Sequence, residues 1–124
     1  MRVITFQPRF QEPVADGRKK QTIRLRARCK PGDELSLRKW KGKPYRSLQL
    51  ELRPRTRCTA VKRVGIFISL TVGRFCITVD DQRLTPEETE AFAKADGFTD
   101  ANDMRAWFEA THELPFDGEL IEWE

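Results

Sequence analysis

The chain has 124 residues, of which 39% are hydrophobic and 34% are charged. This length predicts a single domain over residues 1–124 with one core, and the composition excludes a disordered chain. No apolar run approaches the roughly 20 residues that span a bilayer, and the N-terminal segment lacks the apolar region of a secretory signal, so we expect a cytoplasmic protein with no membrane partner.

Lysine and arginine are concentrated in the first part of the chain. Residues 1–74 contain 20 of them against 5 acidic residues, a net charge of +15, whereas residues 75–124 contain 3 against 14, a net charge of −11. This asymmetry predicts a basic face for a phosphate-bearing partner such as RNA. The alternative is that the two parts neutralise each other within the fold.

The residues that bind metals are few and widely spaced. The chain has three cysteines, Cys29, Cys58 and Cys76, and a single histidine, His112. A structural zinc site needs four ligands at close paired spacings. We therefore expect free thiols, no metal site and no cofactor.

The first elements are a strand and a short helix. Alternation over residues 2–6 predicts the strand. Residues 7–17 predict the helix, which Gly17 ends in the left-handed conformation. Pro13 fits this helix only if it falls in the first turn.

Several more strands are predicted after this helix. Ile23 and Leu25 alternate with arginines over residues 21–27, which predicts a half-buried strand with an arginine face. A turn at residues 31–33 leads into another strand. Residues 47–79 are rich in β-branched and aromatic side chains, and we expect strands there that are separated at Pro54, Gly65 and Gly73.

The last part of the chain predicts two helices and a strand. Thr85 and Glu88 form a capping box at the start of the first helix, and Gly97 ends it. The second helix begins at Thr99 or Asp100 and presents a core-facing stripe. Residues 118–124 predict the final strand. We expect core positions for Met104, Trp107, Phe108, Phe116 and Trp123.

The order of these elements is β, short α, several β, α, α, β. Strands dominate and the helices lie at the flanks. This pattern predicts an α+β domain built on a small mixed barrel or curled sheet.

The segment DGRKKQTIR, Asp16–Arg24, combines a lysine and a hydroxyl at the start of a predicted strand. Lys19 and Thr22 can converge there, and neighbouring cations lower the pKa of an ammonium group. A lysine with a lowered pKa can serve as the general base for a hydroxyl nucleophile. From this chemistry alone, a basic strand edge explains the same residues.

The segments ITF, RF, GRKKQTIR and KPGDELSL resemble the ASCH domain, a PUA-like β-barrel family linked to RNA. The similarity extends to RCTAV and to both C-terminal helical segments, and it is weak over residues 39–57. Small bacterial and phage members resemble this chain most. The resemblance implies a barrel of five or six strands with helices alongside. It is carried by Phe6, Phe10, Gly17, Lys19, Thr22, Arg24, Gly32 and Asp33.

Small bacterial members of this family hydrolyse N4-acetylcytidine with a lysine, a threonine and a glutamate. The resemblance implies that Lys19 takes a proton from Thr22, whose oxygen attacks the acetyl carbonyl. Asp96, one methylene shorter, stands near the family's glutamate and would orient Lys19 or handle the leaving amine. Arg24 or backbone N–H groups would stabilise the oxyanion.

The main function that we expect is binding of RNA or a modified nucleoside in a basic cleft, which needs no catalysis. Trp40 or Tyr45 would stack on a base. Two further alternatives stay open: a lysine-based ribonuclease, and a regulatory module, which a buried and salt-bridged Lys19 would favour. The sequence leaves the oligomeric state open. The cations expected to contact phosphates are Arg18, Lys19, Lys20, Arg24, Arg26 and Arg28.

Overall fold

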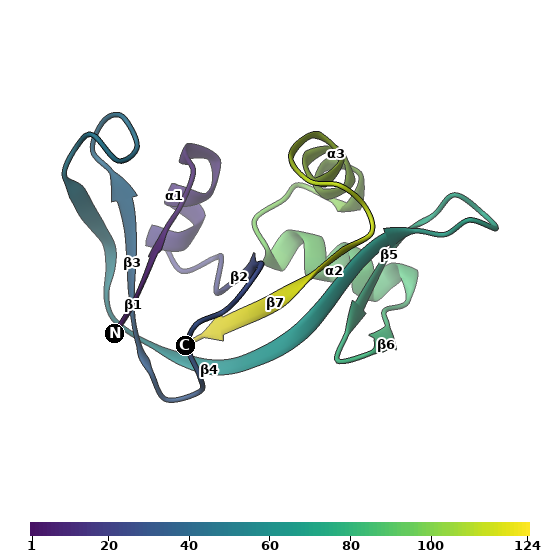
Figure 1. The fold of residues 1–124 in the computed structure, drawn as a ribbon, viewed down its shortest axis with the longest axis horizontal. Coiled ribbons are helices and arrows are strands. Elements are labelled where there is room, and N and C mark those ends of the chain that lie inside the picture. The colour runs from purple at the N-terminus through teal and green to yellow at the C-terminus, as the bar shows by residue number, and fades with distance from the viewer.

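A computed structural model describes residues Met1–Glu124 and confirms the α+β class, with one seven-stranded sheet and three helices (Figure 1). The elements, in chain order, are β1 (Arg2–Thr5), α1 (Pro8–Ala15), β2 (Gln21–Arg24), β3 (Glu34–Trp40), β4 (Gln49–Ile68), β5 (Phe75–Val79), β6 (Gln82–Arg83), α2 (Pro86–Ala95), α3 (Ala101–Thr111) and β7 (Phe116–Trp123).

Strand β4 organises the sheet. It pairs antiparallel with β3, β5 and β7, and it runs as a long curved strand along the molecule (Figure 1). Strand β1 pairs parallel with β3, β6 pairs with β5, and β2 pairs only with β7. These pairings leave the sheet open. None of the three helices has the length and apolar character to cross a membrane.

The prediction that Pro54 and Gly65 separate strands is wrong, because both lie inside β4. The ladder with β3 is irregular between Leu35 and Leu37. There β4 contributes Pro54 and Arg55 opposite a single residue of β3, so the proline occupies a bulge where its missing N–H breaks no ladder bond. Gly73 does separate strands, at the hairpin between β4 and β5.

Gly65 lies within β4 at a position where the neighbouring strand leaves no room for a side chain. A Cβ atom at this position would lie 2.6 Å from Oγ1 of Thr78.

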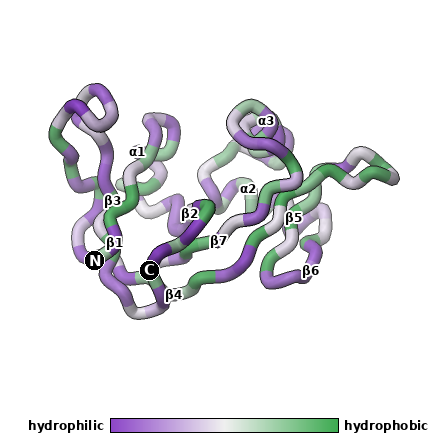
Figure 2. Tube along the Cα trace, viewed as in Figure 1, coloured by the Kyte–Doolittle hydropathy of each residue, from purple (hydrophilic) through white to green (hydrophobic).

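At the end of the hairpin between β4 and β5, Leu70 and Val72 are exposed and form an apolar tip (Figure 2).

The prediction that Pro13 falls in the first helical turn is also wrong, because α1 begins at Pro8. A proline near the end of so short a helix removes only one internal hydrogen bond. Gly17 ends the helix as predicted, with a φ of +85°. The carbonyl of Pro13 accepts a hydrogen bond from the backbone N–H of Lys19, at 2.9 Å.

Strand β2 ends at Arg24, three residues earlier than predicted. The backbone N–H of Ala27 donates to Oε1 of Glu119 in place of a strand carbonyl, at 2.9 Å. Arg28 then has a φ of +54°, which is incompatible with a regular strand. The alternation of Leu25 and Arg26 therefore continues the pattern of a strand beyond its actual end.

The C-terminal helices begin as predicted. The capping box of Thr85 and Glu88 is formed, and the side chain of Asp100 caps α3. Of the expected core residues, Met104, Phe108 and Trp123 are buried, but Trp107 and Phe116 are only half-buried. The last two line a cavity instead.

Candidate functional site

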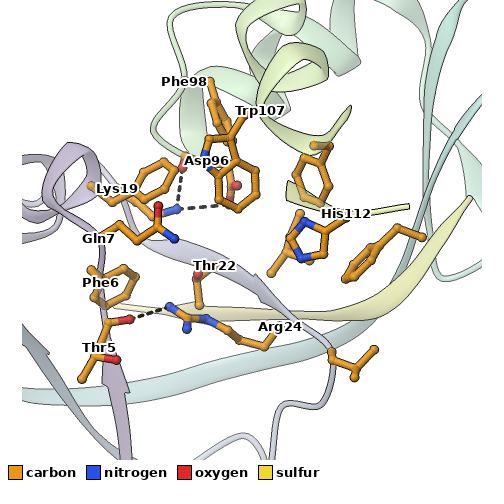
Figure 3. A pocket seen from close by; sticks show the side chains of 15 residues that line it. Thr5, Phe6, Gln7, Lys19, Thr22, Arg24, Asp96, Phe98, Trp107 and His112 are labelled. Carbon is orange, nitrogen blue, oxygen red and sulfur yellow. Dashed lines mark hydrogen bonds and ion pairs between the residues drawn. The ribbon is translucent and has the colours of Figure 1, made fainter. Parts of the chain in front are cut away.

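A cavity of about 240 Å³ lies next to β2, between α1 and the segment that joins α2 to α3 (Figure 3). Aromatic rings form much of its wall, and the polar side chains other than His112 gather on one side of it. The aromatic residues are Phe6, Phe10, Phe98, Trp107, Phe108 and Phe116. The polar and charged side chains used below are Gln7, Lys19, Thr22, Arg24, Asp96 and His112.

Lys19 is fixed by the backbone on both sides. Its own N–H donates to the carbonyl of Pro13, and the carbonyl of Lys20 accepts from the N–H of Trp123 at 3.0 Å. Only 2% of the Lys19 residue surface is exposed. Its Nζ atom lies 4.9 Å from the centre of the Phe10 ring, a distance typical of a cation–π contact.

The carboxylate partner of Lys19 is Asp96, which follows the last residue of α2. Nζ of Lys19 lies 3.3 Å from Oδ1 of Asp96 and also donates to the backbone carbonyl of the same residue (Figure 3). Gln21 contributes an Nε2 atom 3.4 Å from the same Oδ1. The structure thus brings together two of the three predicted catalytic residues.

Burial acts in opposite directions on the two charges of this pair. It lowers the pKa of Lys19 and raises the pKa of Asp96, because both charged forms lose contact with water. The attraction between the two groups opposes both shifts, while Arg24 and Arg9 lower the pKa of Lys19 further. A lysine in this environment loses its proton more readily than an exposed one, which a general base requires.

Thr22 and Arg24 lie two residues apart on β2, so both side chains project from the same face of the strand. Thr22 is 5% exposed and lines the cavity. The ammonium group of Lys19 donates to Asp96 alone, so no hydrogen bond joins it to the Thr22 hydroxyl. Direct proton transfer between them requires a shorter approach than this structure has.

Arg24 connects β2 to the end of β1. Its Nη2 atom donates to the carbonyl of Thr5 at 2.9 Å (Figure 3). The guanidinium carbon lies 5.2 Å from the centre of the Phe6 ring. Burial lowers the pKa of Arg24, but arginine starts so high that the group stays charged at neutral pH.

Trp107 and His112 form the opposite wall, with Phe98 and Phe108. The Trp107 ring centre is 5.7 Å from that of Phe98, 5.0 Å from that of Phe108 and 5.5 Å from that of His112. His112 is exposed at one side, but partial desolvation still lowers its pKa. The imidazole is therefore mostly neutral at pH 7.

The other predicted phosphate contacts do not line this cavity. Arg18 is exposed and pairs with Asp16 at 2.7 Å. Together with Lys20 it borders a separate shallow depression. Arg26 and Arg28 are exposed beyond the end of β2.

Trp40 also lies outside the cavity, at the end of β3. Its ring centre is 5.1 Å from that of Tyr45, which is 87% exposed. These two rings form a surface pair between β3 and β4. The structure therefore does not assemble the single continuous groove that the sequence suggested.

Several residues of the site were missed in the sequence. Gln21 contacts Asp96, and Phe98 lines the cavity. Both lie close to the catalytic candidates in the chain, so proximity in sequence was an available signal. Gln7 and His112 carried no such signal, because only the packing of α3 and of the segment before α1 brings them to the cavity.

No group of three or more histidine, cysteine, aspartate or glutamate side chains is arranged to hold a metal ion. Comparison with known proteins finds no matching family model, no similar curated protein and no similar solved structure. The ASCH resemblance therefore stays a prediction, supported by the motifs quoted above.

Proposed function

We propose that this chain is an ASCH-domain protein of PUA-like architecture whose cavity binds the base of a modified nucleoside, free or within RNA. The observation that carries this proposal is the combination of aromatic walls with hydrogen-bonding groups on one side. Planar bases are bound by stacking on aromatic rings and by polar contacts along their edges. Trp107 and Phe98 supply ring surfaces, and Gln7, Thr22 and Arg24 supply polar groups.

The size of the cavity supports a small ligand. Pockets for drug-sized molecules measure roughly 300–1,000 Å³, and this cavity of about 240 Å³ falls just below that range. A single base or nucleoside suits such a volume, whereas an oligonucleotide would have to place one base inside and leave the rest of its chain on the surface.

The arrangement of the ASCH-like motif supports the family assignment. Lys19, Thr22 and Arg24, which carry the resemblance, all line the same cavity. Arg24 also joins β2 to Thr5 at the end of β1, and these two strands do not pair with each other.

Binding is tested by titrating the protein with N4-acetylcytidine and with cytidine and following tryptophan fluorescence, because Trp107 lies in the cavity wall. We expect saturable quenching, and about 10-fold weaker binding after Phe98→Leu, which removes one stacking surface. Trp40→Leu is the matched control, since this aromatic residue lies outside the cavity. Absence of saturable binding would contradict the proposal.

A gel-shift measurement with RNA at two salt concentrations separates cavity binding from groove binding. Affinity that comes from phosphate contacts falls steeply as salt rises. We expect N4-acetylcytidine binding to depend little on salt. If RNA binding depends steeply on salt and this dependence is lost in the double variant Arg18→Gln, Lys20→Gln, the exposed cations are the main RNA contacts.

A second candidate function is hydrolysis of N4-acetylcytidine, and the Lys19–Asp96 pair beside Thr22 favours it. In this reaction the neutral amine of Lys19 takes the proton of the Thr22 hydroxyl, whose oxygen attacks the acetyl carbonyl. The Lys19 ammonium group then gives this proton to the leaving amino group, the C–N bond breaks and cytidine leaves. Water then hydrolyses the threonine ester and releases acetate.

Chromatography of the reaction mixture tests this second function. Wild-type protein should release cytidine and acetate from N4-acetylcytidine, and Lys19→Ala or Thr22→Val should abolish the release. Lys20→Ala is the matched control, since this neighbouring lysine is exposed and lies outside the cavity. Release that is equal in wild type and in Lys19→Ala would remove the hydrolase function.

The burial and pairing of Lys19 also satisfy the condition that favoured a regulatory module. Nucleoside binding and N4-acetylcytidine hydrolysis both require a ligand in the cavity, whereas a regulatory module does not. If wild-type protein neither binds nor hydrolyses the nucleoside, the ion pair is a purely structural element and the regulatory module is the better proposal. No contact in the cavity specifically favours a ribonuclease.

A further inference from the structure

The guanidinium group of Arg24 is only partly satisfied by the protein. Nη2 donates to the carbonyl of Thr5, which is the group's single hydrogen bond within the chain. The Nε atom is buried and has no partner. Buried donors are nearly always hydrogen-bonded, so an unpaired one beside a cavity requires an explanation.

No carboxylate forms an ion pair with Arg24. Glu119 is its direct partner across the β2–β7 ladder, but no ion pair joins the two residues. Oε1 of Glu119 instead accepts from the backbone N–H of Ala27 at 2.9 Å. Arg2 lowers the pKa of Arg24 and the Asp96 carboxylate raises it, but Asp96 already pairs with Lys19.

The cavity therefore carries one uncompensated positive charge. Its ionisable lining groups are Lys19, Arg24, Asp96 and His112. Lys19 and Asp96 neutralise each other, and a proton that moves between them leaves their sum unchanged. His112 is mostly neutral at pH 7, because its pKa lies below the ordinary 6.5. The charge of Arg24 is then left for a ligand to balance.

We propose that the ligand of this cavity carries an oxyanion that accepts hydrogen bonds from Arg24 while its planar ring lies against Trp107 and Phe98. Guanidinium groups bind phosphate and carboxylate through two parallel N–H donors, and Arg24 retains donors that the protein does not use. The inference rests on the proposed function and narrows it from a neutral nucleoside to a phosphorylated one. The phosphate belongs either to a free nucleotide or to an RNA backbone.

Titration calorimetry with matched ligands tests this inference. The ligands are N4-acetylcytidine, its 5′-monophosphate, and a dinucleotide that carries an internal phosphodiester next to N4-acetylcytidine. We expect the monophosphate or the dinucleotide to bind at least about 10-fold more tightly than the nucleoside, as charge-assisted hydrogen bonds allow. A preference for the monophosphate indicates a free nucleotide, and an equal gain for the dinucleotide indicates RNA.

The variant Arg24→Gln should weaken binding of the phosphorylated ligands much more than binding of the neutral nucleoside, and so remove this preference. Arg26→Gln is the matched control, because it removes an equivalent charge two residues along the chain from an exposed position. A second variant, Arg24→Lys, keeps the charge and should retain part of the preference. Circular dichroism of each variant establishes that it is folded.

Failure of this inference is distinguishable from failure of the proposed function. Equal affinities for the nucleoside and its phosphates in wild type would overturn the inference and leave nucleoside binding intact. An Arg24→Gln variant that binds all three ligands more weakly by the same factor would also overturn the inference. If none of the three ligands binds, the nucleoside function fails. Titration with phenyl phosphate then tests the oxyanion site by itself. Arg24-dependent binding of phenyl phosphate supports that site, and its absence overturns it.

Discussion

Nζ of Lys19 lies 3.3 Å from Oδ1 of Asp96, although the two residues are 77 positions apart in the sequence. The same ammonium group donates to the backbone carbonyl of Asp96. One side chain therefore neutralises a buried carboxylate and satisfies a carbonyl at the C-terminal end of α2. This contact joins the start of β2 to the helical part of the molecule.

Removal of one partner of this pair should destabilise the fold strongly. Lys19→Met leaves the Asp96 carboxylate buried and unpaired, and the expected loss is about 3–5 kcal/mol in the free energy of unfolding. The double variant Lys19→Met, Asp96→Leu should lose less than the sum of the two single variants. Urea denaturation of all four proteins measures this coupling.

Lys62 provides the control for this comparison. It pairs with Glu122 at 3.2 Å, but both side chains are about one-third exposed. Lys62→Met should cost less than about 1 kcal/mol, since exposed ion pairs contribute little. Additive losses at Lys19 and Asp96 would show that the two groups do not interact energetically.

Gly97→Ala should destabilise the protein more than Gly32→Ala. Both glycines have a positive φ, +98° and +94°, so both substitutions carry a similar backbone cost of about 1–2 kcal/mol. At Gly97 a Cβ atom would also lie 3.1 Å from Cδ of Lys19 and from Cδ1 of Phe10, whereas at Gly32 nothing lies within 4 Å. Thermal unfolding of the two variants should reveal the difference.

The cavity itself provides a second readout for this pair of variants. Gly97→Ala displaces the side chain of Lys19, so nucleoside binding should weaken, and Gly32→Ala should bind as wild type does. Equal stability and equal binding in the two variants would mean that the contact between Gly97 and Lys19 is unimportant.

The titration of His112 should occur below its ordinary pKa of 6.5, because burial disfavours the charged imidazole. Its depressed pKa in the folded state contributes stability that is present above pH 6.5 and is lost as the pH falls through the folded pKa. This is the only histidine in the chain, so its ring protons give a single set of signals in an NMR titration. A midpoint at or above 6.5 would contradict the prediction.

A comparison with His112→Gln isolates this contribution to stability. Between pH 7.5 and pH 5 the wild type should lose more stability than the variant, and urea midpoints at the two pH values measure the difference. A bound anion beside Arg24 should raise the NMR midpoint, because a nearby negative charge favours the imidazolium.

Cys29 should react slowly with alkylating reagents. Burial and the nearby thiol of Cys58 raise the pKa of Cys29 to about 11. At pH 8 this lowers its thiolate fraction about 100-fold relative to an ordinary cysteine. Iodoacetamide labelling followed by peptide mass spectrometry should show slow modification of Cys29 in the native protein and rapid modification in urea; fast native labelling would count against this environment.

The sequence was most informative where local chemistry decides the structure. The capping box at Thr85 and Glu88 depends on residues within one helical turn, and Gly17 ends α1 because its φ is positive. Predictions failed where a distant residue overrides the local pattern. Glu119 takes the N–H of Ala27 and ends β2 early, and Pro54 stays within β4 because the opposite strand accommodates a bulge.

The site was predicted only in part, because some of its residues are close in sequence and others are brought together by distant contacts. Lys19, Thr22 and Arg24 lie within one short motif, so their proximity follows from sequence distance alone. The proximity of Asp96 to Lys19 was implied only by the family resemblance. The role of Trp107 was missed because a core-facing helical stripe looks the same whether it meets other side chains or the wall of a cavity.

Strand β2 has no strand partner except β7, the last strand in the chain. During biosynthesis the motif near the N-terminus therefore emerges long before the residues that fix its geometry. Contacts between segments so distant in sequence form slowly, since a large loop must close first. The nascent chain therefore has no completed ligand pocket until β7 is synthesised.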